Sequence, residues 1–185
     1  MKKNATGYIL KLTLTLFIIT AVVAVLLGAV NAITKEPIAA YKAQKTAEAI
    51  REVLPSDAEP EELSDYTDES GAVTHFYKVG EDGYAVELVV GGSQGDIDMM
   101  VGVAADGTVS GVSFISMAET AGLGAVAAQN GAKGEAFRSQ FIGMSGEVLV
   151  TKDGGSVDSI SGATVTSRAV ALGVTDALAC VAANS

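Results

Sequence analysis

The sequence predicts an α+β fold, an antiparallel sheet with packed helices, preceded by one N-terminal transmembrane helix. Three observations predict it. Residues 12–33 form a run of 22 residues without a charged side chain. Four apolar runs, grouped in pairs around Asp-Gly dipeptides, follow the acidic middle of the chain. Near the C-terminus, apolar residues recur at the spacing of one helix face, at Val170, Val174, Leu178 and Val181.

The apolar run 12–33 has the length of a membrane span. At about 1.5 Å of rise per residue it covers roughly 33 Å, slightly more than a hydrocarbon core of about 30 Å. Three lysines within residues 1–11 precede it, so the positive-inside rule places that segment in the cytoplasm and the domain outside. A cleaved signal peptide is the alternative, because Val30-Asn-Ala32 resembles a cleavage site. The apolar run exceeds the usual 7–15 residues of a signal peptide. We therefore expect a retained, single-pass anchor in the cell membrane.

Two segments connect the span to the domain. Residues 34–55 are expected to form a juxtamembrane helix, with Pro37 in its first turn and Pro55 at its end. Residues 56–71 carry seven acidic and no basic side chains, which is typical of a solvated loop. The domain itself is expected to comprise residues 72–185.

Asp-Gly pairs between apolar runs predict two β-hairpins. Runs 72–79 and 84–90 flank Asp82-Gly83, and runs 97–104 and 108–116 flank Asp106-Gly107. A glycine-rich connector, Gly91-Gly92-Ser-Gln-Gly95, joins the hairpins. The later expected elements are a helix at 135–141, a short strand at 148–151, a turn at 153–155 and a helix from 165 to 181.

Composition excludes several functions. The net charge is −10, and the residues after Lys35 hold eight basic against 22 acidic side chains, a balance of −14. Such a domain lacks the basic surface that nucleic acids require, so we expect no nucleic-acid partner. One histidine, His75, and one cysteine, Cys180, cannot form a His/Cys metal cluster. We interpret His75 as a strand residue and Cys180 as a core residue, and we expect neither a catalytic residue nor a metal site.

The segment Asp158-Ser-Ile-Ser-Gly-Ala-Thr-Val-Thr-Ser167 carries the functional prediction. It places Thr164 at the expected start of the last helix, where unpaired backbone N–H groups suit a phosphate. Gly162 and Ala163 leave room for a bulky group beside the backbone. A cluster of helix-capping hydroxyls is the alternative interpretation, since Ser and Thr are preferred N-caps.

The pattern Asp-x-x-Ser-Gly-Ala-Thr-x-Thr-Ser resembles the flavinylation motif of the FMN-binding domain family. That family includes the G subunit of the Rnf electron-transport complex and the C subunit of the sodium-pumping NADH:quinone reductase. The resemblance implies that Thr164 carries FMN through a phosphoester bond, installed from FAD by a separate flavin transferase. It also implies that Asp158 and Ser161 to Ala163 form the recognition sequence. Thr166 is a further candidate cofactor-binding residue and the alternative acceptor.

Two other segments resemble the same family. Glu119-Thr-Ala-Gly-Leu-Gly124 is similar to its Glu-Thr-Pro-Gly-Leu-Gly loop, and Phe137-Arg-Ser-Gln-Phe-Ile-Gly143 to its Phe-x-x-Gln-Phe-x-Gly helix. Ala121 stands where the family usually has Pro, which leaves the loop's φ angle freer. The resemblance places four residues of this loop near the flavin: Glu119, Thr120, Leu123 and Gly124.

The resemblance implies a membrane-anchored electron-transfer subunit, a redox part of a larger translocase. The flavin supplies the redox chemistry and the protein attaches and orients it. Between these two complexes, the short chain resembles more the subunit of an Rnf-type complex, which couples electron flow between ferredoxin and NAD to ion translocation. Its partners are then the other membrane subunits. Two alternatives remain: a free-standing flavinylated extracytoplasmic carrier, and a non-redox membrane-tethered binding or structural module.

Overall fold

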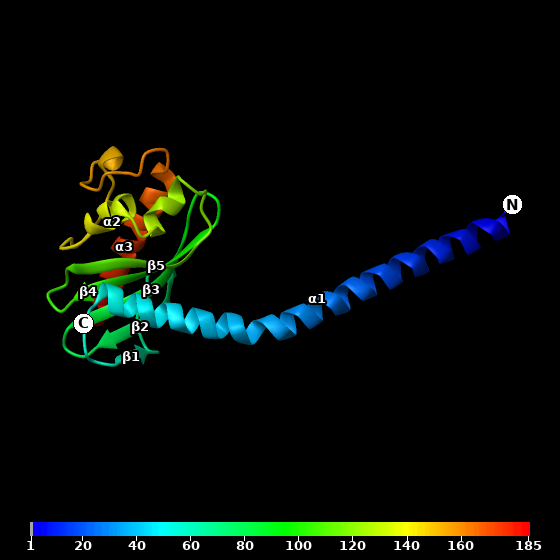
Figure 1. The fold of residues 1–185 in the computed structure, drawn as a ribbon, viewed down its shortest axis with the longest axis horizontal. Helices are drawn as coiled ribbons and strands as arrows, with labels where there is room; N and C mark the ends of the chain where they lie inside the picture. The colour runs from blue at the N-terminus through cyan, green and yellow to red at the C-terminus, as the bar shows by residue number, and fades with distance from the viewer. Residues whose placement is uncertain (1) are drawn as a thin grey trace. The chain divides into compact units, whose positions relative to one another are not determined.

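The computed structural model describes residues 2–185, with side chains from residue 7 onward, and it divides into two units, Met1–Gln44 and Lys45–Ser185. Figure 1 shows the order of the elements. They are α1 (Lys2–Val53), β1 (Pro60–Leu63), β2 (Val73–Val79), β3 (Gly83–Gly91), β4 (Asp96–Ala104), β5 (Val109–Met117), the 3-10 helix η1 (Gly124–Ala128), α2 (Ala132–Ser139), the 3-10 helix η2 (Thr151–Asp153) and α3 (Thr164–Asn184).

The first unit is the apolar part of α1. Two helices among the described residues are long and apolar enough to cross a membrane, α1 and α3, but α3 is largely buried in the domain. Within α1, Thr13, Thr15 and Thr20 donate their hydroxyls to backbone carbonyls four residues earlier, at 2.9–3.0 Å. Polar groups satisfied within the helix suit a lipid environment. The expected apolar N-terminal helix is confirmed.

The helix continues through Pro37, where a new helix was expected to begin. A proline inside a helix removes one backbone donor and crowds the preceding turn. The sequence after Pro37 is rich in Ala, with Lys and Glu also present, and these residues of high helix propensity extend α1 to Val53.

The second unit contains one antiparallel sheet with its strands in chain order, β1-β2-β3-β4-β5. Both expected hairpins are present. β2 pairs with β3 across the first Asp-Gly turn, and β4 pairs with β5 across the second. In the centre of the sheet Val86 lies opposite Val101, which in turn lies opposite Val112. The predicted α+β architecture is therefore confirmed.

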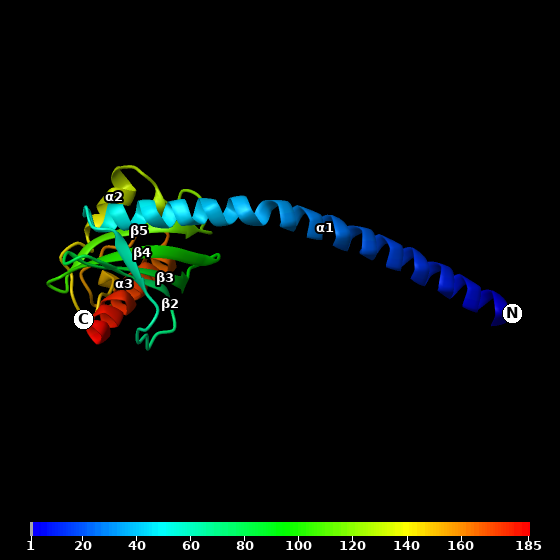
Figure 2. The same ribbon diagram turned by 90° about the horizontal axis from the view of Figure 1, so that it is seen from below.

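Helices cover both faces of the sheet (Figure 2). On one face, apolar side chains of β3 and β4 such as Leu88 and Met99 pack with Val170 and Val174 of α3. On the other face, the last turns of α1 bury Val53 against the sheet. This second contact is close, because a Cβ atom added at Gly102 would lie 2.5 Å from the Val53 carbonyl oxygen.

Two expected elements differ in the structure. The acidic segment contains the short strand β1, which pairs with β2 at the sheet edge. Its glutamates are exposed, and charged side chains are usual on edge strands. The segment therefore lacks the alternation of apolar and polar residues that would have predicted a strand. The expected strand at 148–151 is a single parallel bridge between Val150 and Val157, followed by η2. The pairing does not continue beyond Val150, because η2 begins at the next residue and turns the chain away.

The lone histidine and cysteine lie where the sequence predicted. His75 is in β2, with its Nδ1 atom 2.7 Å from Oε1 of Glu62 at the surface. Cys180 is buried in the core, and burial raises the pKa of its thiol to about 11. Among the described residues no cluster of His, Cys, Asp or Glu is arranged to hold a metal ion.

Candidate functional site

A tight turn leads into α3. The Ala163 N–H donates to the Ile160 carbonyl oxygen at 2.9 Å, and Gly162 adopts a φ of +78°, a conformation that favours glycine at this turn position. The buried Ser167 hydroxyl accepts from the Ile160 N–H and donates to the Ala163 carbonyl, both at 3.0 Å. This hydroxyl therefore fastens the turn to the first turn of the helix.

The hydroxyls of the motif do not cap α3. Ala163 occupies the N-cap position, and within residues 2–185 no side chain makes the capping hydrogen bond to this helix. The start of a 21-residue helix is therefore left with its N–H groups and the positive end of its dipole available. The capping interpretation of this Ser/Thr cluster is not supported by the hydrogen bonds.

Thr164 is half-buried and receives a hydrogen bond from a lysine. The Nζ atom of Lys152, in η2, lies 2.8 Å from Thr164 Oγ1. The next residue, Asp153, accepts two hydrogen bonds of 2.6 Å from Arg168, one turn along α3 from Thr164. That pairing holds the pKa of the Asp153 carboxyl below its ordinary value. Because Asp153 fastens η2 to α3, Lys152 is held beside the threonine.

A carboxylate joins three segments next to the start of α3. Glu119 Oε1 accepts from the N–H groups of Ser93, at 2.5 Å, and Gln94, at 3.3 Å. Glu119 Oε2 accepts from Thr166 Oγ1 at 3.1 Å. We call these three hydrogen bonds the carboxylate clasp. It ties the glycine-rich connector, the loop after β5 and the first turn of α3 into one body.

The loop after β5 packs closely on the motif. A Cβ atom at Gly124 would lie 2.6 Å from Thr166 Oγ1 and 2.7 Å from Glu119 Oε2, so only glycine fits without a shift. The Leu123 side chain, 42% exposed, lies 3.1 Å from the position that a Cβ of Gly162 would occupy. Thr120 is exposed, and its carbonyl accepts from two N–H groups of the following turn.

Helix α2 holds the other end of the motif through Gln140, which immediately follows it. Gln140 Oε1 accepts from the Asp158 N–H at 2.7 Å, and Gln140 Nε2 donates to the Asp158 carbonyl at 3.3 Å. Phe137 and Phe141 make an edge-to-face contact with ring centres 5.3 Å apart and anchor this segment in the core. Phe137, Gln140 and Phe141 therefore act together: the two rings anchor the segment and the amide holds the motif.

A cavity of about 350 Å³ lies between α2 and the motif. Its wall includes Val126, Phe137 and Ile160, with Lys133 among its polar lining. The volume falls within the roughly 300–1,000 Å³ of ligand pockets. The hydroxyl oxygen of Ser159, also in the lining, is buried and has no hydrogen-bond partner among the described residues.

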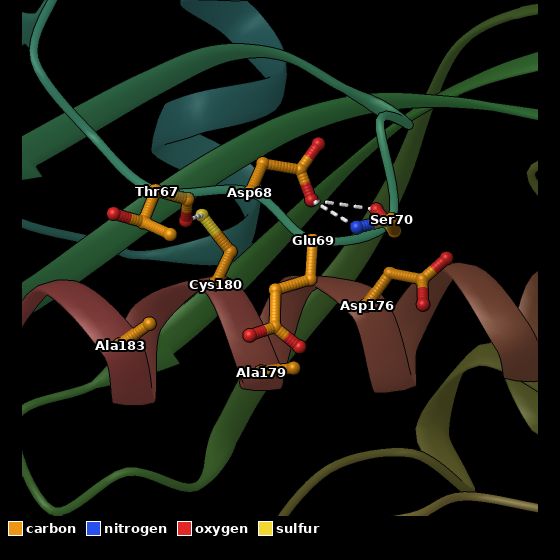
Figure 3. A pocket seen from close by; sticks show the side chains of 8 residues that line it. All are labelled: Thr67, Asp68, Glu69, Ser70, Asp176, Ala179, Cys180 and Ala183. Carbon is orange, nitrogen blue, oxygen red and sulfur yellow. Dashed lines mark hydrogen bonds between the residues drawn. The ribbon is translucent and has the colours of Figure 1, made fainter.

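A second cavity, of about 380 Å³, lies by the C-terminal half of α3 and has acidic walls (Figure 3). Asp68 accepts hydrogen bonds from the N–H and hydroxyl of Ser70. Burial, and then the charge of Asp68, raise the pKa of the Asp176 carboxyl. Carboxylates repel an anion, so a phosphate-bearing ligand fits the start of α3 and not this cavity.

The ten residues singled out from the sequence lie in two segments, the loop after β5 and the turn into α3, which the hydrogen bond between Thr166 and Glu119 joins. The residues that contribute to the site but were not singled out include Lys152, Gln140 and Ser167. Gln140 and Ser167 belong to the segments that resemble the family, but the sequence assigned neither residue a role. Lys152 carried no sequence signal, because a lone lysine 12 residues before Thr164 is indistinguishable from a solvated one.

Comparison with known proteins places these features in a family. A family model described as FMN-binding domain matches residues 92–179. The chain is 36% identical over 172 residues to the G subunit of the ion-translocating oxidoreductase complex of Methanosarcina acetivorans, an alignment that covers 88% of each protein. It is 32% identical over 188 residues to the G subunit of the Na(+)-translocating ferredoxin:NAD(+) oxidoreductase complex of Acetobacterium woodii, covering 90% of this chain and 88% of that protein.

A solved structure is also similar. It is the C subunit of the Na(+)-translocating NADH-quinone reductase from Parabacteroides distasonis, with a TM-score of 0.45 and 30% sequence identity over 57% of this chain and 58% of that one.

Proposed function

Because this chain belongs to the family of the G subunits of ion-translocating oxidoreductase complexes and contains their FMN-binding domain, we propose that it is a membrane-anchored electron-transfer subunit with FMN attached covalently to Thr164. The attachment is a phosphoester between the Thr164 hydroxyl and the FMN phosphate. A flavin transferase installs it, with FAD as the donor. The partners are the other membrane subunits of an Rnf-type complex, which couples electron flow between ferredoxin and NAD to ion translocation.

The observation that carries this proposal is the Thr164 hydroxyl at the uncapped start of α3, next to the Lys152 ammonium. Helix N-termini bind phosphate through their free N–H groups and dipole. Gly162 and Ala163, which precede the threonine, add almost no side-chain volume, so a large group reaches the hydroxyl. The residues present therefore fit a phosphate-linked cofactor.

The hydrogen bonds also favour Thr164 over Thr166 as the acceptor. Thr166 is 1% exposed, and its hydroxyl donates to Glu119 within the carboxylate clasp. Using it as the acceptor would require breaking the clasp and opening the first turn of α3. Thr164 is half-buried, and its oxygen is reachable without such a change.

The cavity between α2 and the motif is the proposed binding site of the flavin ring. Its apolar wall, with Phe137 and Val126, would bind an aromatic ring, and the Ser159 hydroxyl offers a buried polar group that has no other partner among the described residues. When bound, FMN supplies the redox chemistry. The chain's residues attach it, orient it and keep the surrounding segments fixed through the carboxylate clasp. Asp158 and Ser161 belong to the sequence that the transferase recognises. The exposed Thr120 and Leu123 line the approach, and Gly124 lets their loop pack against Thr166.

The apolar helix α1 is the proposed membrane anchor. The lysines near its N-terminus and the absence of acidic residues before Lys35 favour a cytoplasmic N-terminus, with the domain on the outer side and one crossing of the membrane.

Mass spectrometry of the denatured protein, purified from its native host, tests the attachment. The expected result is an added mass of FMN less one water on the peptide that contains Thr164. Thr164→Ala should abolish it in a folded protein, and the matched control Thr164→Ser, which keeps a hydroxyl, should retain it. An unmodified wild-type chain, even with a flavin transferase supplied, would contradict the proposal. Flavin retained by Thr164→Ala would move the acceptor to Thr166 or another hydroxyl.

A further inference from the structure

We propose that Lys152 is the cationic partner of the phosphoryl group at Thr164. It orients the Thr164 hydroxyl for transfer of the flavin phosphate and afterwards pairs with the phosphodiester. This inference rests on the proposed attachment of FMN and adds a positioning residue that lies outside the recognition sequence.

The geometry assigns the direction of the hydrogen bond. A lysine ammonium carries three donors and no acceptor, so at 2.8 Å Lys152 Nζ donates and Thr164 Oγ1 accepts. The hydroxyl's own proton must therefore point away from Lys152. That proton stays available to a base of the transferase, and one oxygen lone pair remains for attack on phosphorus.

The hydrogen bonds around Thr164 assign this role to Lys152 and not to Arg168. Arg168 lies one turn along α3 but is held by Asp153 through two hydrogen bonds of 2.6 Å, so its charge is compensated. Lys152 instead directs its Nζ atom at the acceptor oxygen. The residues after Lys35 carry a balance of −14, which disfavours an added phosphodiester unless a cation lies next to it. Charge-assisted hydrogen bonds from Lys to phosphate meet this need.

The Thr164 Oγ–P bond forms at the flavin-side phosphorus of FAD, and the diphosphate P–O bond on the AMP side of that phosphorus breaks. AMP leaves with the bridging oxygen, and the threonine proton passes to a base of the transferase. Negative charge grows on the phosphoryl oxygens during this step. A fixed ammonium beside them stabilises that charge more than it stabilises the ground state.

Flavin uptake by the full-length chain in detergent tests the role of Lys152. The chain is incubated with a flavin transferase and FAD, and covalent flavin is measured over time by fluorescence of the denatured protein and by intact mass. Lys152→Met should lower the initial rate by about 10- to 100-fold, the effect of losing a charge-assisted hydrogen bond. Lys152→Arg, which keeps the charge, should stay within several-fold of wild type. Lys78→Met is the matched control, because Lys78 is exposed on β2 and its loss changes the net charge equally.

A second readout separates the proposed role from a purely structural one. In chains loaded to completion, phosphorus NMR of the phosphodiester should show a shifted resonance in Lys152→Met and an unchanged one in Lys78→Met. Lys152 is exposed, so its variants should fold, and Lys152→Gln provides a second neutral variant.

The outcomes distinguish this inference from the proposed function. If wild type takes up no flavin, the proposed function fails and this inference with it. If wild type takes up flavin and both neutral variants match its rate and its phosphorus resonance, only the role of Lys152 is wrong. Slow uptake by both neutral variants, with near-normal uptake by Lys152→Arg, would support the proposal.

Discussion

Removing the carboxylate clasp should destabilise the domain measurably. Glu119→Ala deletes the acceptor of three hydrogen bonds and leaves the Thr166 hydroxyl, 1% exposed, buried without its partner. Each hydrogen bond to a charged group contributes roughly 1.5–3 kcal/mol, and a buried unsatisfied hydroxyl costs roughly 1–3 kcal/mol. Glu119 is itself partly exposed, and water can replace part of the loss. We therefore expect a net cost of about 2–4 kcal/mol.

Thermal unfolding of the full-length chain in detergent, followed by circular dichroism, measures this cost. At roughly 3 °C per kcal/mol for a domain of this size, the midpoint should fall by about 6–12 °C. Glu119→Gln keeps one acceptor oxygen and nearly the same shape, so it should lose clearly less. Glu61→Ala on the exposed edge strand β1 is the surface control and should change the midpoint by less than about 2 °C.

A double-mutant cycle with Thr166→Val decides whether the clasp is the cause. Glu119 and Thr166 share a hydrogen bond, so their two effects should couple by about 0.5–3 kcal/mol. A Glu119→Ala midpoint within about 2 °C of wild type would refute the reasoning. Effects that add without coupling would show that Glu119 acts through other contacts.

Three further predictions follow from the same structure. Gly124→Ala should cost about 1–3 kcal/mol, because its Cβ would press on the clasp, whereas Gly91→Ala, in open space, should cost less than about 1 kcal/mol; thermal midpoints compare them. Arg168 holds the pKa of Asp153 below its ordinary 3.8, so this pairing stabilises the fold above that pH and is lost as pH falls through the lower folded-state value. The midpoint gap between wild type and Asp153→Asn should therefore shrink on acidification, and a gap independent of pH would contradict the pairing. Cys180, buried with a pKa of about 11, should resist a maleimide at neutral pH and react after unfolding, as mass spectrometry would show; rapid native labelling would argue against its burial.

The elements with strong local signals were predictable from the sequence. The two hairpins follow from Asp-Gly pairs between apolar runs, and α3 follows from apolar residues at helical spacing. The edge strand β1 was missed because its Glu-rich sequence lacks alternation, and the short strand at 148–151 was predicted wrongly from apolar composition alone. Apolar runs of a few residues do not distinguish a strand from a bridge.

The candidate site, like the fold, was predictable from the sequence only in its local parts. The sequence by itself determined the Ser-Gly-Ala-Thr motif, its position at a helix start and the apolar N-terminal helix, because each depends on residues adjacent in the chain. Only the tertiary structure decided that Lys152 binds Thr164, that Gln140 holds Asp158 and that Glu119 holds Thr166. These partners are 12, 18 and 47 residues apart, and no local pattern encodes such distances. Folding of α2, η2 and the loop after β5 around the start of α3 brings them together.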